Sequence, residues 1–165
     1  FMKTKLLYND NISANISLIA TSSTKNKIFQ NVKINFDFSN GKINLDRTRL
    51  VNKKIGFLEL DNSNLFLKNE RLILNTNILI NIGNSDELFS LLQTNKKSRK
   101  LIKQVLINID YDFLTKQIDF NNVKIDNNEV NDSLLRIIDR LNDNNINNLI
   151  KSRVIINELF EAYDG

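Results

Sequence analysis

The side chains best suited to acid–base chemistry are aspartates in the second half of the chain. Asp110 and Asp112 lie two residues apart, and Asp119 and Asp126 follow them. Residues two apart on a strand share one face, so Asp110 and Asp112 would lie on a polar, solvated face. Nothing in the neighbouring sequence would raise the pKa of a carboxyl there, as a general acid requires. We therefore predict no catalytic residue and expect that the protein is not an enzyme.

The composition excludes other common catalytic and metal sites. The sequence of 165 residues has no His and no Cys, which excludes Ser-His-Asp and Cys-His nucleophiles, the usual zinc sites and disulfides. Its four glycines are too widely spaced for a phosphate-binding loop or a dinucleotide fingerprint. Residues 139–145 lack the central Gly and the terminal Glu of a calcium loop. We expect no metal and no cofactor.

The basic residues are spread along the chain. The net charge is +4, and the pI is about 9.3. Because no basic arm or tail is present, we expect no nucleic-acid partner. One denser run follows a predicted helix, where cations are favoured by the helix dipole. It is either a soluble loop or a lipid-headgroup contact, and the headgroup candidates are Lys96, Lys97, Arg99 and Lys100.

The elements that must position these residues are mainly strands. Residues 71–82 alternate apolar and polar side chains, as a half-buried strand requires. Asn40-Gly41 predicts a type I′ hairpin, and Asn62-Ser63-Asn64 predicts a further turn. The spacing predicts strands over residues 3–8, 12–20, 28–38, 43–52, 55–60, 65–68, 71–82, 105–113 and 117–125.

Three segments have helical spacing instead. Asn84 followed by Glu87 predicts a cap for a short helix near 85–94, with its apolar stripe at Leu88, Leu91 and Leu92, beside Phe89. From residue 128 the period is helical to the end of the chain, with a break at 142–145. The two C-terminal stripes are Val130, Leu134, Ile137, Ile138 and Leu141, then Ile146, Leu149, Ile150, Val154 and Phe160.

These elements predict one α+β domain. Residues 1–126 would form an antiparallel meandering sheet, possibly an open groove, with the short helix inserted. Residues 127–165 would form a cap of two amphipathic helices in the same domain. Because Phe1 precedes Met2, we expect this sequence to be part of a longer protein.

Three segments carry a family resemblance. They read IGFLELDNSNLFLKNERLILNTNILINI, then NSDELFSLLQTNKKSRK, then VLINIDYDFLTKQIDFNNVKIDNNEVNDSLLRIIDRLND. Together they resemble the C-terminal region of the bacterial AsmA-like envelope proteins, over roughly residues 30 to 165. The resemblance implies a periplasmic β-groove that binds phospholipid in support of outer-membrane biogenesis. It also implies an inner-membrane anchor outside this sequence, and partners in the upstream part of the same chain and among envelope proteins.

The apolar face of the sheet supplies the candidate binding residues. If the helices leave part of this face uncovered, the uncovered strip would bind acyl chains. The alternatives are a structural cap that closes the end of a longer sheet, and an enzyme with convergent carboxylates and lysines. The groove candidates share one strand parity, and for each residue taken singly the spacing favours ordinary core over a groove role: Val32, Ile34, Phe36, Ile43, Leu45, Leu58, Leu60, Leu72, Leu74, Ile78, Ile80, Ile107 and Ile109.

Overall fold

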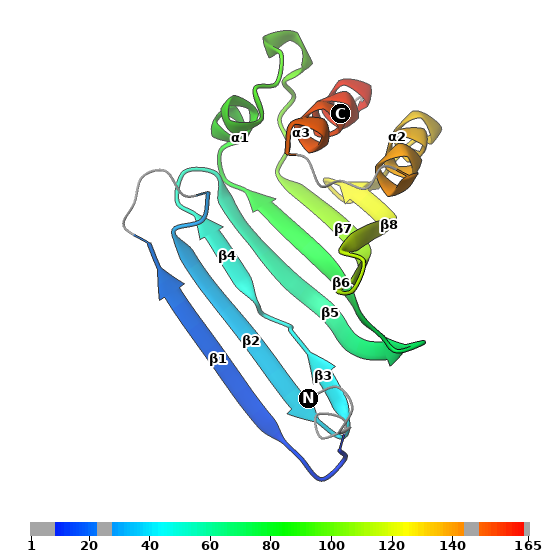
Figure 1. Ribbon diagram of the computed structural model, residues 1–165. Helices are drawn as coiled ribbons and strands as arrows, with labels where there is room; N and C mark the ends of the chain where they lie inside the picture. Colours follow the sequence, from blue (N-terminus) through cyan, green and yellow to red (C-terminus); the bar gives the residue numbers. More distant parts are fainter. Residues whose placement is uncertain (1–8, 23–27, 144–148, 164–165) are drawn as a thin grey trace.

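A computed structural model describes residues 9–22, 28–143 and 149–163 of the chain. These residues form one nine-stranded antiparallel sheet and three α-helices (Figure 1), which confirms the α+β class. The strands are β1 (Ala14–Thr21), β2 (Asn31–Ser39), β3 (Lys42–Asn44), β4 (Arg49–Asn52), β5 (Gly56–Lys68), β6 (Arg71–Ile82), β7 (Gln104–Asp112), β8 (Gln117–Ile125) and β9 (Asn128–Glu129). The helices are α1 (Ser85–Leu92), α2 (Asp132–Asp143) and α3 (Leu149–Ala162), with a 3₁₀ turn η3 (Lys96–Ser98).

The sheet is a meander in which strand order follows chain order. β1 lies at one edge and pairs with β2, and β8 and the short β9 form the other edge. β3 and β4 both lie between β2 and β5, as two parts of one interrupted strand. The predicted strand 3–8 lies outside the described residues.

Left-handed residues turn the chain at the hairpins. Asn40 and Gly41 have φ of 50° and 68°, which confirms the predicted type I′ geometry between β2 and β3. Asn69 and Glu70 have φ of 51° and 61° and connect β5 to β6 in the same way.

The turn predicted at residues 62–64 is wrong, because β5 passes straight through this segment. β5 pairs with β6 on both sides of a register shift between Asp61 and Asn64, which is a β-bulge. Asn62 takes the left-handed conformation, with φ of 50°. The Ser63 N–H and hydroxyl both donate to the Asp46 carboxylate, at 2.7 and 2.6 Å. These bonds hold the bulge against the connection between β3 and β4. The polar residues therefore form a bulge within β5, and the chain does not turn back there.

The helix that follows β6 begins where it was predicted. Asn84 is extended, and its side chain accepts a hydrogen bond from the Glu87 N–H. Gln93 ends the helix in the left-handed conformation. The predicted stripe is wrong at Leu91, which is 40% exposed, because Phe89 is the fully buried residue of this helix.

The C-terminal helices also differ in detail from the predicted pattern. Residues 128 and 129 form β9, so α2 starts later, at Asp132. α2 buries Leu134 and Ile138, as predicted. In α3 the prediction for Val154 is wrong: this residue is 52% exposed, while Ile155 and Phe160 are buried. Ile146 lies outside the described residues, and Phe160 packs edge-to-face on Phe89 of α1, with ring centroids 5.3 Å apart.

The main core lies between the helices and one face of the sheet. Its buried members come from β6, β8, all three α-helices and the segments beside them: Ile82, Phe89, Ile102, Ile125, Leu134, Phe160 and Tyr163. Figure 1 shows α1, α2 and α3 gathered beside β6, β7 and β8, far from β1. The helices therefore pack on one part of the sheet.

Candidate functional site

The cross-strand register builds a continuous apolar face across the sheet. Each strand places alternate residues on this face, and successive pairings align them into rows. One row crosses seven strands through directly paired residues, from Ala20 through Val32, Leu50, Leu58, Ile80 and Val105 to Ile125. A second runs along β5, β6, β7 and β8 through Leu60, Ile78, Ile107 and Val123.

A cavity of about 430 Å³ lies between this face and the helices. Ile80 and Ile107 contribute from the sheet, Leu88 from α1, Ile138 from α2 and Leu159 from α3. Every lining residue is apolar, the others being Ile82, Leu92, Val105, Ile118, Phe120, Val123, Ile125, Val130, Ile156 and Phe160. A space of this size and chemistry can hold an apolar chain and offers no polar group for catalysis.

The cavity brings together only two of the thirteen groove candidates, Ile80 and Ile107. Three more, Ile43, Leu74 and Ile109, are buried and present no open surface. The remaining candidates are half-buried, and they lie in β2, β5, β6 and the β3–β4 connection: Val32, Ile34, Phe36, Leu45, Leu58, Leu60, Leu72 and Ile78.

The sequence reasoning missed most of the cavity wall. Val105, Val123 and Ile125 have the strand parity of the chosen candidates and could have been included on that ground. Leu88 and Ile138 belong to the predicted helical stripes, which were assigned to packing. Ile156 and Leu159 had no such signal, because the register predicted for α3 centred on other residues.

The four basic residues proposed as headgroup contacts differ in their hydrogen bonds and exposure. The Lys100 ammonium donates to the Tyr163 carbonyl beyond α3, and the Arg99 guanidinium Nε donates to the Thr94 carbonyl at 3.2 Å. Lys100 therefore joins the segment after α1 to the residue that follows α3, while the Arg99 bond lies within that segment. Lys96 and Lys97 are exposed, so they are the freest of the four headgroup candidates to meet an anion.

The aspartates lie on the opposite, polar face and form local pairs. Asp110 accepts a 2.7 Å hydrogen bond from Asn75, and Asp112 forms a 3.0 Å ion pair with Arg71. Burial disfavours the charged Asp112 carboxyl, but backbone N–H donors at Leu114 and Thr115 and the Arg71 charge outweigh it and lower its pKa. A lowered pKa keeps this carboxylate ionised, which suits a structural ion pair.

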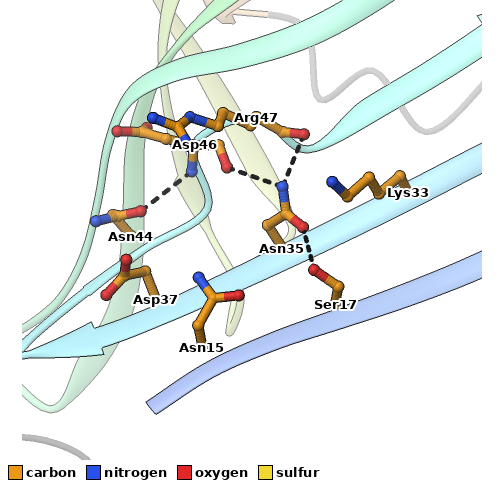
Figure 2. A pocket seen from close by; sticks show the side chains of 8 residues that line it. All are labelled: Asn15, Ser17, Lys33, Asn35, Asp37, Asn44, Asp46 and Arg47. Carbon is orange, nitrogen blue, oxygen red and sulfur yellow. Dashed lines mark hydrogen bonds between the residues drawn. The ribbon is translucent and has the colours of Figure 1, made fainter. Parts of the chain in front are cut away.

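A polar pocket of about 300 Å³ lies on this same face over β1, β2 and β3 (Figure 2). Asn35 lies at its centre: its Oδ1 accepts from the Ser17 hydroxyl at 2.6 Å, and its Nδ2 donates to the Arg47 carbonyl at 3.0 Å. Asn35 is buried and its polar atoms are satisfied. The pocket residues therefore fasten the β3–β4 connection to the sheet.

Within the described residues, no group of three or more acidic side chains is arranged to hold a metal ion. None of the described helices combines the length and the apolar character needed to cross a membrane.

No protein-family model, no curated protein and no solved structure matches this chain.

Proposed function

We propose that this protein binds phospholipid acyl chains in the helix-covered cavity and along the apolar face that continues from it. The single observation that carries the proposal is the cavity of about 430 Å³ with a wholly apolar lining. Ligand pockets typically have about 300–1,000 Å³. Each methylene buried there contributes about 0.8 kcal/mol, so one acyl chain would bind with useful affinity.

The energetic cost of leaving such a space empty supports a ligand. Residual cavities in cores cost about 24 cal/mol per Å³. The space of about 430 Å³ is partly open, so this enclosed-core figure does not apply to it in full, but its apolar wall still lacks the contacts that a packed core would supply. An acyl chain would restore the missing contacts without any polar group needing a partner.

The apolar face beyond the helices extends the proposed site into a groove. The row of paired residues runs from the cavity at Ile80 through Leu58 and Val32 to β1. On β1, Leu18 is 54% exposed and Ile16 is 46% exposed. The groove would guide a chain that is too long for the cavity, with its headgroup near Lys96 and Lys97.

The biological setting proposed here follows the family resemblance. The chain would be the non-catalytic C-terminal module of an AsmA-like envelope protein, located in the periplasm and anchored in the inner membrane through a segment outside this sequence. Its partners would be phospholipid, the upstream part of the same chain and other envelope proteins. Its role would be to support outer-membrane biogenesis.

A charge placed in the cavity wall tests this function. Ile80→Asp should weaken binding of a phospholipid with a fluorescent acyl chain by at least about tenfold, because a carboxylate would have to be desolvated against the chain. Leu79→Asp is the matched control, since Leu79 is adjacent but faces the other side of the sheet and pairs with Glu59 and Leu106. Circular dichroism verifies that both variants fold. Equal binding by both would contradict the proposal.

A structural cap is the second candidate, and a specific contact favours it. The Asn142 side chain of α2 accepts from the Phe120 N–H at 2.7 Å and donates to the Phe120 carbonyl at 3.1 Å. These two bonds satisfy the backbone N–H and carbonyl of Phe120, as a further strand paired with β8 would do. If capping is the whole function, deletion of residues 130–165 should cause association through β8, and the intact protein should carry no lipid.

A further inference from the structure

The two edges of the sheet differ in how they end. At the β8 edge, β9 pairs with Lys124 and Ile125, and Asn142 hydrogen-bonds both backbone groups of Phe120. Side chains and a short strand thus occupy backbone groups that another strand would need. These contacts cover part of the β8 edge, in the manner that sheet proteins use against association.

The β1 edge has no such protection in the described part of the chain. β1 pairs only with β2, through all its residues from Ala14 to Thr21, so its outer backbone groups face away from the sheet. All of its residues are exposed. Charged residues, Pro and Gly are the features that usually prevent or weaken edge-to-edge pairing. The strand, ANISLIAT, has none of them. An exposed and uncharged edge strand can serve as a template for pairing with another strand.

The order of side chains in β1 indicates which strand it accepts. On the apolar face the residues run small, large, large, small, at Ala14, Ile16, Leu18 and Ala20. This order reads the same in both directions. Because the strand is uncharged, it meets no repulsion when it pairs with its own sequence.

We propose that β1 pairs antiparallel with β1 of a second copy of this chain, about a twofold axis at Ser17. This register places Ile16 opposite Leu18 of the second copy, and Ala14 opposite Ala20. A shift of one residue would place each of these apolar side chains beside a residue whose side chain points to the other face of the sheet. The contact is isologous and uses the β1 edge of both copies, and the contacts that cover part of the β8 edge oppose further growth into a filament. The apolar faces of the two copies become continuous.

Engineered cysteines test the register directly, because the sequence contains no Cys. Ser17→Cys would lie opposite itself across the axis, with Cα atoms about 4.5–5.5 Å apart, which permits a disulfide. Ile19→Cys is the control on the same strand face. Its two copies would be offset by four residues, or about 13 Å, beyond the roughly 7 Å limit for a disulfide. Mild oxidation should crosslink the Ser17→Cys protein to a dimer and leave Ile19→Cys uncrosslinked.

Light scattering after gel filtration measures the assembly without crosslinking. The unmodified protein should have twice the chain mass of 19.1 kDa. Leu18→Lys should give a monomer, because it places a charge on the edge strand. Leu67→Lys should stay dimeric, since Leu67 is also exposed but lies on β5, away from this edge.

Three results would overturn the proposal. The first is an unmodified protein that stays monomeric at its highest soluble concentration. If the β1 amides of that monomer also resist hydrogen exchange, another segment of the same chain covers the edge. The second is equal crosslinking of Ser17→Cys and Ile19→Cys. The third is a Leu18→Lys protein that remains dimeric.

Discussion

Filling the cavity should stabilise the protein and remove its lipid site in the same step. Val105 lines the cavity from β7 and is half-buried. In Val105→Phe the added ring atoms contribute about 3 kcal/mol, at about 0.8 kcal/mol per buried carbon group. Strain from overpacking offsets about 1–2 kcal/mol of this. The expected net gain of about 1–2 kcal/mol raises the Tm by about 2–8 °C for a chain of this length.

Thermal unfolding with and without a lysophospholipid below its micellar concentration measures both effects. A ligand present at about 100 times its Kd stabilises the folded state by about 2.7 kcal/mol, so the unmodified protein should show a clear rise in Tm. Val105→Phe should start from a higher Tm and show almost no rise. Leu106→Phe is the control, because Leu106 is the next residue of β7 and pairs with Leu79 and Lys124 on the other face. It should keep the full lipid response.

Two results would refute this reasoning. If Val105→Phe were less stable than the unmodified protein, the space beside Val105 would not exist in solution. If it were more stable but kept the full lipid response, the lipid would bind somewhere other than the cavity.

Three further changes test the supporting structure. Asn142→Ala leaves both backbone groups of Phe120 without their partner; urea unfolding should show a loss of about 1–3 kcal/mol, and the Phe120 amide should exchange faster. Asp112→Asn should destabilise the protein at neutral pH, because the folded carboxyl has a pKa below its ordinary 3.8. The stabilisation by the Asp112 carboxylate is present above the unfolded pKa of about 3.9 and is lost as the pH falls through the folded value. The urea midpoints of the variant and the unmodified protein should therefore converge in acid. A difference that stays constant with pH would exclude the ionised Asp112–Arg71 pair as the source of the stabilisation. Gly56→Ala should cost at least about 2 kcal/mol, since Gly56 has φ of +146° and a Cβ there would lie 2.0 Å from the Asn81 carbonyl oxygen; an unchanged thermal midpoint would contradict this packing.

Much of the sheet could be predicted because its signals are local. Alternation with a period of two predicts both the strand and the face of each side chain, as for Ile78 and Ile80 in β6. The Asn40-Gly41 hairpin depends on two residues that tolerate positive φ. The Asn84 cap depends on one side chain and an amide three residues away. Each of these features is decided within a few residues of sequence.

The features that could not be predicted depend on distant partners. Asn62 and Ser63 have turn-forming residue types, but Asp46, 17 residues earlier in the chain, holds Ser63 from the neighbouring β3–β4 connection, so this segment forms a bulge. In α3, more than one set of apolar residues could face the core. The helix orientation in which Phe160 contacts Phe89 of α1 leaves Val154 exposed. The cavity is bounded by elements far apart in the chain, so no short pattern foretells it.

Native mass spectrometry of the purified protein tests the central claim most directly. The spectra should show one or more acyl lipids that copurify with the unmodified protein and that are absent from Val105→Phe prepared in the same way. A lipid-free unmodified protein that also fails to take up added phospholipid would contradict lipid binding and leave the structural cap as the function.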